Sequence, residues 1–152
     1  MGIGGEYVCD KCGYKSEQIL MGPGFLSAPR HPMIGARIMN GEYGEKAKKI
    51  LEENPDSEFS FYMGIYQCRC GNITSEDVVR IWSRGKKIDE GVPWTFGGPK
   101  TDVYERGKIL YRPVVKCKEC GKRMCEVMDP PMEMPCPKCG GTMGFNHDLF
   151  WD

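Results

Sequence analysis

The sequence predicts a small α+β protein stabilised by metal ions, with two cysteine-bearing β-hairpin modules and a helical insertion in the first of them. Three observations lead to this fold class. Nine of the 152 residues are cysteines, and eight of these nine form close pairs. Glycine and proline supply 20 and 11 positions, and long apolar runs are lacking, so one large hydrophobic core is not expected. One short stretch has a clear amphipathic helical pattern, whereas the strand-like segments lie beside the cysteine pairs.

Each cysteine pair has the form of a metal-binding turn. A glycine follows the second cysteine of every pair, and glycine adopts the positive φ that such a tight turn requires. In a C-x-x-C-G turn both sulfurs face one point, and backbone N–H groups donate to the first of them. The odd cysteine count and the absence of an export signal favour thiolate metal sites in a reducing cytoplasm over disulfides. The pairs are Cys9/Cys12, Cys68/Cys70, Cys117/Cys120 and Cys136/Cys139, and Cys125 stands alone.

Distance along the chain suggests how the four pairs combine into two four-thiolate sites. The third and fourth pairs are separated by residues 121–135 only, a loop length typical of a ribbon built from two hairpins. We therefore expect one metal to be bound by Cys117, Cys120, Cys136 and Cys139. The other metal would then be bound by Cys9, Cys12, Cys68 and Cys70, across the longer insertion 13–67. The spacing in Cys68-Arg69-Cys70 is tighter, but residues two apart on an extended chain point to the same side.

The predicted elements follow from local patterns. Residues 44–54 (GEKAKKILEEN) form the best helix, ended by Pro55, and residues 32–39 (PMIGARIM) form a second helical segment. Strands are expected at Tyr7-Val8 and over 59–66 and 109–115, each leading into a cysteine pair. Residues 77–82 (DVVRIW) fit either a strand or a short helix. Residues 91–100 (GVPWTFGGPK) are too rich in glycine and proline for a regular element.

These patterns divide the chain into an N-terminal module at 1–90, a Gly/Pro-rich linker at 91–104 and a C-terminal ribbon with an aromatic tail at 105–152. The aromatic residues of the linker and the tail are interpreted as packing between the two modules, with a docking site for another protein as the alternative. Five methionines crowd the C-terminal ribbon and are expected to fill its small core, with an adaptable binding surface as the alternative. The aromatic residues are Trp94, Phe96, Phe150 and Trp151. The methionines are Met124, Met128, Met132, Met134 and Met143.

Four thiolates complete the tetrahedral coordination of zinc and leave no position for a water molecule or a substrate. The two sites are therefore expected to stabilise the fold rather than to catalyse a reaction. Lys+Arg and Asp+Glu balance at 21 each, and each zinc with four thiolates carries about two negative charges. The metallated protein should therefore be acidic, whereas a general nucleic-acid binder is usually basic.

Two resemblances to known families accompany this reading. The stretch from Tyr7 to Tyr14 (YVCDKCGY) resembles a rubredoxin knuckle, and the stretch from Cys136 to Gly140 (CPKCG) resembles the partner knuckle. Rubredoxins hold iron in four thiolates and transfer electrons, so this likeness implies iron as an alternative metal.

The wider layout resembles a group of uncharacterised bacterial zinc-ribbon proteins. The likeness implies metal binding and no established activity. In that group the second half-site is commonly C-x-x-C-G, and the shorter spacer here is a departure that concerns the geometry of the first site. The matching stretches are Met1 to Gly13, MNGEYGE ending at Glu45 before the Lys/Glu-rich helix, the half-site from Tyr66 to Gly71, and the terminal ribbon.

The functional expectation is a non-enzymatic, cytoplasmic protein that binds two Zn²⁺ and acts as a recognition or adaptor module. A protein partner is favoured, and no membrane partner is expected. One alternative is a rubredoxin-like iron protein for electron transfer. A second is a nucleic-acid-binding zinc ribbon, which would touch RNA or DNA through Lys118, Lys122 and Arg123.

The remaining residues with metal-binding or nucleophilic side chains receive simple interpretations. Cys125 is expected to be a small buried or partly buried thiol, with a redox-active thiol or a spare ligand as the alternative. His31 and His147 are expected to be ordinary polar residues. No Ser/His/Asp arrangement, phosphate-binding loop or pair of catalytic carboxylates is identifiable.

Overall fold

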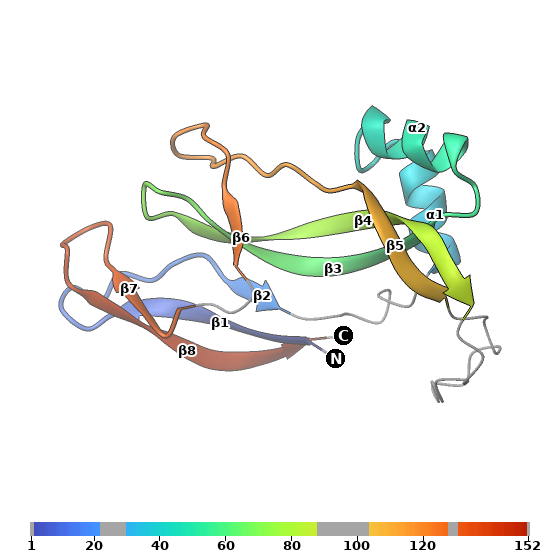
Figure 1. Ribbon diagram of the computed structural model, residues 1–152. Helices are drawn as coiled ribbons and strands as arrows, with labels where there is room; N and C mark the ends of the chain where they lie inside the picture. Colours follow the sequence, from blue (N-terminus) through green and yellow to red (C-terminus); the bar gives the residue numbers. More distant parts are fainter. Residues whose placement is uncertain (1, 22–29, 88–103, 128–130, 152) are drawn as a thin grey trace. The chain divides into compact units, whose positions relative to one another are not determined.

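The computed structural model describes residues 2–21, 30–87, 104–127 and 131–151 (Figure 1). These residues form two helices and eight strands, which confirms the α+β class. The helices are α1 (Pro32–Met39) and α2 (Glu45–Glu53). The strands are β1 (Gly2–Cys9), β2 (Ile19–Met21), β3 (Glu58–Gln67), β4 (Ile73–Lys87), β5 (Tyr104–Tyr111), β6 (Cys125–Val127), β7 (Glu133–Pro135) and β8 (Thr142–Trp151).

The strands form two four-stranded antiparallel sheets. The first sheet has the order β2-β1-β8-β7, and the second has the order β5-β4-β3-β6. In the first sheet, β1 pairs along its whole length with β8, from Gly2 opposite Trp151 to Cys9 opposite Met143. Strands from the two ends of the described chain are therefore neighbours in space.

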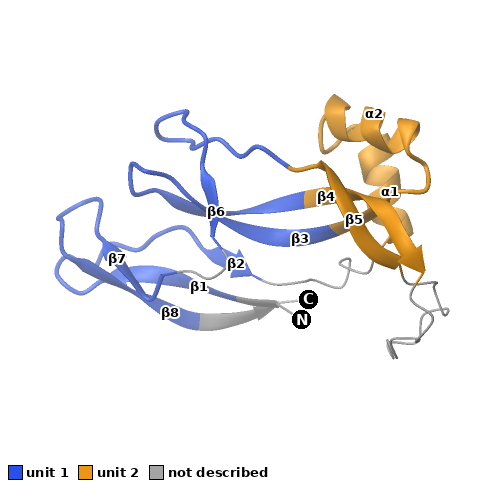
Figure 2. Ribbon diagram, viewed as in Figure 1, with its two compact units in different colours: residues 1–28, 61–78, 113–152 blue, residues 29–60, 79–112 orange. Residues whose placement is uncertain are grey.

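The chain divides into two compact units (Figure 2). Unit 1 contains residues 1–28, 61–78 and 113–152, and unit 2 contains residues 29–60 and 79–112. This division differs from the predicted modules at 1–90 and 105–152, because each unit combines stretches from both modules. The physical reason is the pairing of β1 with β8 in unit 1 and of β4 with β5 in unit 2. Except for Tyr104, the predicted linker 91–104, with Trp94 and Phe96, lies outside the described residues.

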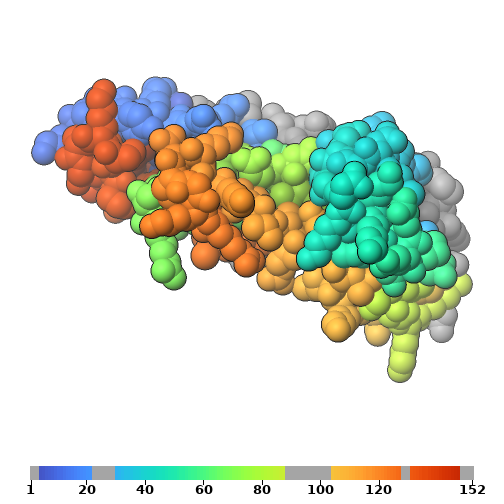
Figure 3. Space-filling model, turned by 90° about the horizontal axis from the view of Figure 1, so that it is seen from above, coloured from blue at the N-terminus to red at the C-terminus, as the bar shows by residue number. Residues whose placement is uncertain are grey.

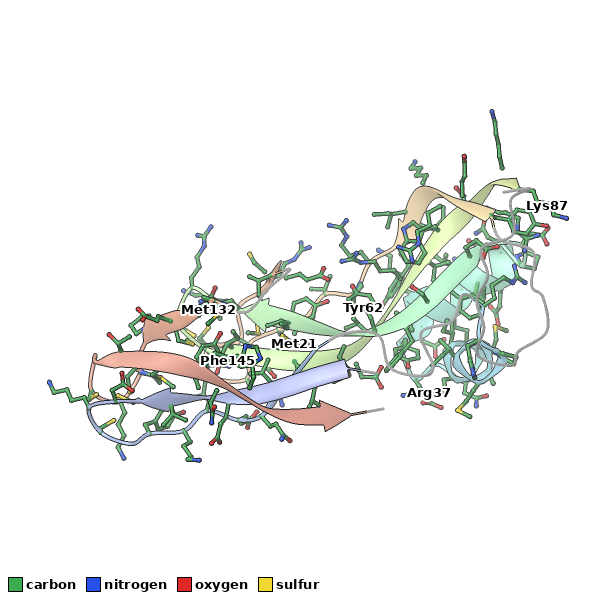
Figure 4. All side chains as sticks on the ribbon, turned by 90° about the horizontal axis from the view of Figure 1, so that it is seen from below. Met21, Arg37, Tyr62, Lys87, Met132 and Phe145 are labelled. Carbon is green, nitrogen blue, oxygen red and sulfur yellow. The ribbon has the colours of Figure 1, made fainter. Side chains whose placement is uncertain are left out.

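A hydrophobic cluster holds unit 1 together. It combines residues of the first sheet with Ile65 of β3 and Ile73 of β4 from the second. Met21 and Phe145, both labelled in Figure 4, belong to it. Burial of these side chains supplies the apolar contribution to stability, at roughly 25 cal/mol per Å² removed from water. The buried members are Tyr7, Cys9, Ile19, Met21, Ile65, Ile73, Met134, Cys136, Met143 and Phe145.

The two helices belong to unit 2. Helix α1 begins where the Nδ1 atom of His31 accepts a hydrogen bond from the Met33 N–H, with Pro32 at the first helical position. It buries Ile34 and Ile38. Helix α2 buries Ala47 and Leu51, which lie four positions apart and therefore on one face of the helix.

Residues 77–82, which fit a strand or a helix by pattern, lie in the middle of the long strand β4. The pattern was ambiguous because this part of the strand is buried on both faces: Val78, Val79, Ile81 and Trp82 are all buried. A strand that is covered on both sides loses the alternation that normally identifies it.

Candidate metal centres

The eight paired cysteines form two four-sulfur groups, and both groups lie in unit 1. In each group the sulfur atoms all lie within 4.8 Å of one another. The outer site consists of Cys9, Cys12, Cys136 and Cys139, and the inner site consists of Cys68, Cys70, Cys117 and Cys120.

The residues of the two sites agree with the sequence analysis, but the predicted pairing of half-sites is wrong. The sequence grouped Cys9 and Cys12 with Cys68 and Cys70, and Cys117 and Cys120 with Cys136 and Cys139. In the structure the first half-site meets the fourth, and the second meets the third. The reason is again the β1–β8 pairing, which places Cys9 opposite Met143, close to the fourth half-site.

All four half-sites share one backbone turn. In each turn the N–H of the glycine donates to the carbonyl oxygen of the first cysteine, at 2.9–3.0 Å. The four glycines have φ between 67° and 95°, a region that other residues rarely adopt. They are Gly13, Gly71, Gly121 and Gly140, so the conformation predicted from the repeated Cys-Gly dipeptide is confirmed.

The half-site of Cys68 and Cys70 forms the same kind of turn with one residue fewer. A second hydrogen bond closes each turn from the N–H of the first cysteine. In the half-site of Cys117, for example, it reaches the carbonyl of Lys122. In the half-site of Cys68 it reaches the carbonyl of Asn72 at 2.8 Å, four positions after the cysteine rather than five. The Cys68-Arg69-Cys70 spacing therefore still presents both sulfurs to one point.

The sulfur–sulfur distances fit a bound tetrahedral ion and do not fit disulfides. In the outer site Cys9 lies 3.5 Å from Cys139, and Cys12 lies 3.8 Å from Cys136. In the inner site Cys68 lies 3.4 Å from Cys120. A tetrahedron with metal–sulfur bonds of about 2.3 Å has sulfur–sulfur edges of about 3.8 Å. A disulfide bond is about 2.05 Å long, so these contacts are those of separate thiols arranged around a common centre.

Burial is divided in the same way in both sites. The first cysteine of every pair is buried, with 2–4% of its surface exposed, whereas the second is exposed or half-buried. Each site thus has two sulfurs anchored in the hydrophobic clusters of unit 1 and two nearer the solvent. Cys9 and Cys136 belong to the cluster described above, and Cys68 and Cys117 belong to a second cluster with Tyr66, Val78 and Met124.

N–H groups surround the sulfurs and favour their ionised form. In the outer site the backbone N–H of Lys138 donates to Cys136 and that of Gly141 donates to Cys139, both at 3.4 Å. In the inner site the side-chain amide of Asn72 donates to Cys117 at 3.5 Å. The sequence analysis missed Asn72, whose only local signal is its position directly after Gly71. Such donors orient ligands and stabilise thiolates.

The thiols of the outer site have strongly divided pKa values. Burial raises the pKa of Cys9, but hydrogen bonds from the backbone N–H groups of Cys12 and Lys11, and from neighbouring thiols, lower it to about 7. The N–H of Gly141 lowers the pKa of Cys139, but its contacts with the other three thiols and its burial raise it to about 12. One sulfur therefore ionises readily while another retains its proton, as expected for acidic groups in contact.

The inner site shows the same division. Burial raises the pKa of Cys117, but the N–H of Cys120, the amide of Asn72 and the N–H of Glu119 lower it to about 6. The pKa of Cys70 is raised: the N–H of Asn72 lowers it, but Cys68, burial and Cys117 together have the larger effect. A divalent ion replaces the remaining thiol protons when it binds, so both groups have the chemistry of a metal site.

The remaining candidate residues lie outside both groups. Cys125 is exposed, so the prediction of a buried or partly buried thiol is wrong. It lies opposite Gln67 in the β3–β6 pair, on an edge strand of the sheet. His31 caps α1, and His147 is an exposed residue that packs edge-on against Phe145.

The methionine and lysine predictions have mixed outcomes. Met124, Met134 and Met143 are buried, as expected for core residues, whereas Met132 is 67% exposed and Met128 lies outside the described residues. Lys118, Lys122 and Arg123 are exposed around the inner site. Lys118 lies 3.9 Å from Glu76, an ion pair of low stabilising value at such exposure.

Comparison with protein-family models, with curated proteins and with solved structures finds no match to this chain. The metal-binding geometry therefore carries the functional argument. None of the helices in the described ranges is long and apolar enough to cross a membrane.

Proposed function

We propose that this chain is a non-enzymatic zinc-ribbon protein, in which two Zn²⁺ ions stabilise a surface used for molecular recognition. The observation that carries the proposal is the completeness of both four-sulfur groups. Four thiolates at tetrahedral spacing complete the coordination of zinc, so no position is left for a substrate or a reactive water molecule. In the described residues neither group includes a histidine or a carboxylate that would indicate an open catalytic site.

The energetic role of the ions follows from the size of the two clusters that surround them. A structural zinc ion contributes an apparent binding free energy of roughly 10–16 kcal/mol, as large as the net stability of an ordinary domain. In this protein the four buried ligands connect β1, the β3–β4 turn and the two knuckles after β5 and β7. Zinc binding is therefore coupled to the formation of unit 1.

The metal is tested by purifying the full chain and measuring its composition and colour. Zinc in both sites predicts about two zinc ions per chain and no visible absorption, because zinc has a filled d shell. Iron in a rubredoxin-like site predicts a red, reducible chromophore and would replace the proposal by the electron-transfer alternative.

A pair of double variants tests the observed grouping of the ligands. In Cys9→Ser/Cys136→Ser both changes fall in the outer site, so one zinc per chain should remain. In Cys117→Ser/Cys136→Ser one change falls in each site, so both zinc ions should be weakened or lost. The grouping by distance along the chain predicts the opposite result for the two variants. Cys125→Ser, which changes no ligand, is the matched control and should retain both ions.

The described surface gives limited support to a protein partner. Its large exposed hydrophobic residues are spread over α1, β5 and two segments outside the helices and strands: Met33, Met39, Ile109, Val114 and Met132. Basic residues, in contrast, are concentrated on two paired strands of unit 2.

A further inference from the structure

The basic charge of unit 2 is concentrated on two paired strands. The end of β4 and the strand β5, with Arg112 after it, cover residues 79–87 and 104–112 of this unit. We call these two stretches the basic hairpin. They contain one acid, Glu105, and seven basic residues: Arg80, Arg84, Lys86, Lys87, Arg106, Lys108 and Arg112. The described residues 30–60 of the same unit contain five basic and six acidic residues, so the excess belongs to the hairpin alone.

Four of these cations are exposed and have no carboxylate partner in the described part of the chain. They are Lys86, Arg106, Lys108 and Arg112. Arg84 differs, because its guanidinium contacts Glu58 at 3.0 Å and Asp56 at 3.7 Å. In Figure 3 atoms of β5 and of the end of β4 lie at the surface beside the two helices, and Figure 4 labels Lys87 at the end of β4.

Two arginines of the hairpin lie over aromatic rings. The guanidinium of Arg106 lies 4.5 Å from the centre of the Trp82 ring, and that of Arg84 lies 4.3 Å from the Tyr104 ring. Arg84 and Arg106 are also direct cross-strand partners, so these four side chains form one ladder on one face of the sheet. A position over a ring restricts the movement of each guanidinium. The N–H groups of Arg106 stay available for an anion, whereas those of Arg84 already contact Glu58 and Asp56.

The direct opposition of Arg84 and Arg106 is unfavourable in itself. Like charges opposite each other across two strands destabilise a sheet. Glu58 and Asp56 offset the charge of Arg84, but in the described chain nothing offsets that of Arg106. A local conflict of this kind is typical of a binding site, where the ligand supplies the missing charge.

Protection of a sheet edge does not explain the sign of the charge. β5 is an edge strand, and charged side chains on edge strands prevent unwanted pairing with other chains. The other edge strands, however, carry no basic residue: β2 has no charge, while β6 and β7 have one glutamate each. The seven-to-one excess of basic residues therefore requires a different reason.

We propose that the basic hairpin binds single-stranded nucleic acid. Lysine and arginine side chains along the two strands would contact the phosphates, and the exposed face of Arg106 and the ring of Tyr104 would stack against bases. Planar groups at fixed positions favour nucleic acid over an acidic protein, which needs no stacking surface. The proposal goes beyond the zinc-stabilised fold and does not depend on it, since unit 2 contains none of the eight ligands.

The experiment uses the purified, metal-loaded full chain and fluorescence anisotropy. The probes are single-stranded RNA, single-stranded DNA and duplex DNA of about 16 nucleotides, the upper end of the site sizes of an OB-fold, a well-known class of single-strand-binding domain. If four cations each neutralise one phosphate, the slope of log affinity against log salt is about −2.8 for a single strand, so affinity falls about 50-fold between 50 and 200 mM salt. Binding of either single strand with this salt dependence supports the proposal.

Three variants locate the surface. Lys86→Glu/Lys108→Glu should weaken binding at least tenfold and make the salt slope shallower by about 1.4. Lys46→Glu/Lys49→Glu, on α2 of the same unit, has the same change in net charge and should bind as the unchanged protein does. Lys118→Ala/Lys122→Ala/Arg123→Ala removes the cations around the inner zinc site and should also bind normally. Zinc content and melting temperature establish that each variant is folded.

The stacking ladder has its own test. Arg106→Lys keeps the charge but loses the planar group, so we expect weaker binding with little change in the salt slope.

Several results would overturn the proposal. They are the absence of binding by the unchanged protein, tighter binding of the duplex than of either single strand, and equal competition by polyglutamate, which would assign the surface to an acidic protein. Loss of binding in the Lys118/Lys122/Arg123 variant but not in the hairpin variant would place nucleic acid at the inner zinc site instead.

Discussion

At the scale of single residues, Asn72 is the side chain that connects the two halves of the inner site. It directly follows the half-site of Cys68 and Cys70, yet its amide donates to Cys117 of the opposite half-site. Its backbone carbonyl meanwhile closes the turn that begins at Cys68. One residue thus shapes one half-site and stabilises the thiolate of the other.

Replacing Asn72 should therefore weaken only the inner site. In Asn72→Ala the donor to Cys117 is lost. We expect the zinc affinity of this site to fall about 10–100-fold, as is typical when a hydrogen bond to a metal ligand is removed. Competition with a coloured chelator measures the affinity. Asn146→Ala, an exposed asparagine in β8, is the control and should leave both sites unchanged. Equal weakening of the outer site by Asn72→Ala would contradict this assignment.

Tyr7 predicts how stability depends on alkaline pH. Its ring is fully buried, its hydroxyl donates to the carbonyl of Pro131 at 2.7 Å, and burial raises its pKa from 10.0 to about 12. Between these values the unfolded chain loses the tyrosine proton while the folded chain keeps it. Stability from this group is therefore complete below pH 10 and declines as the pH rises toward 12.

The measurement is urea unfolding of Tyr7→Phe and of the unchanged protein at a series of pH values. The variant loses a hydrogen bond, so we expect it to be about 1 kcal/mol less stable at neutral pH. It should also show a smaller decline above pH 10. An equally steep decline in both proteins would show that Tyr7 does not titrate as described.

The ligand residues could be predicted because their signal is local. Each Cys-x-x-Cys-Gly turn is defined within five residues, and Gly13, Gly121 and Gly140 adopt the conformation that the motif requires. The exposure of Cys125 could not be predicted in this way. It depends on the position of β6 at the edge of a sheet, which sequence pattern does not reveal.

At the scale of secondary-structure elements, the close contact of β1 with β8 explains the glycine at position 5 of the chain. A Cβ atom at Gly5 would overlap the carbonyl oxygen of Asn146 and lie 2.9 Å from the Phe145 ring. The pairing register also shifts between Gly4 and Gly5, as in a β-bulge. Glycine is required here because the partner strand lies too near for any side chain.

Gly5→Ala should consequently loosen the β1–β8 pair. We expect a loss of stability at or above the upper end of the about 1–3 kcal/mol typical of overpacking, because the overlap involves backbone that moves little. Zinc should be lost from the outer site before the inner one, since β1 leads directly into Cys9. Thermal unfolding and zinc content measure both effects. Gly144→Ala in β8, where a Cβ meets nothing within 4 Å, is the matched control.

Helices were predicted more accurately than strand partners. The segment 32–39 and the core of 44–54 have an apolar face that is visible within ten residues, and both form helices at the expected places. Strand pairing depends on contacts between distant segments. The pairing of β1 with β8 joins residues more than a hundred positions apart, and no pattern in either strand specifies the other.

At the scale of the whole molecule, the two metal sites are nested along the sequence. The ligands of the outer site lie on both sides of those of the inner site, with Cys9 and Cys139 130 positions apart and Cys68 and Cys120 52 positions apart. Four half-sites can be combined into two sites in three ways, and the sequence favoured the combination with short connections. Closing a short loop costs less conformational entropy than closing a long one, but this cost rises only slowly with loop length. The difference is smaller than the stabilisation gained when a full strand is paired.

Removing the metal should unfold unit 1. Four of the ligands are buried members of its two hydrophobic clusters. When zinc is withdrawn, the thiolates of a site would repel one another or lose their packing in these clusters. We expect a strong chelator to abolish protection of residues 4–9 and 142–147 from hydrogen exchange, and added zinc to restore it. Persistence of this protection in verified metal-free protein would show that the apolar contacts alone maintain the unit.

The nesting has a consequence for how the protein is made. A chain leaves the ribosome from its amino end at about 5–20 residues per second. Cys9, followed closely by Cys12, therefore emerges roughly 7–26 s before Cys139, which lies 130 positions after Cys9. During that interval the next thiols to appear are Cys68 and Cys70, which are able to take up zinc together with the first pair. Correct assembly during translation therefore requires that this early adduct form weakly or exchange its ligands quickly, so that free zinc concentration and synthesis rate both affect the yield of native protein.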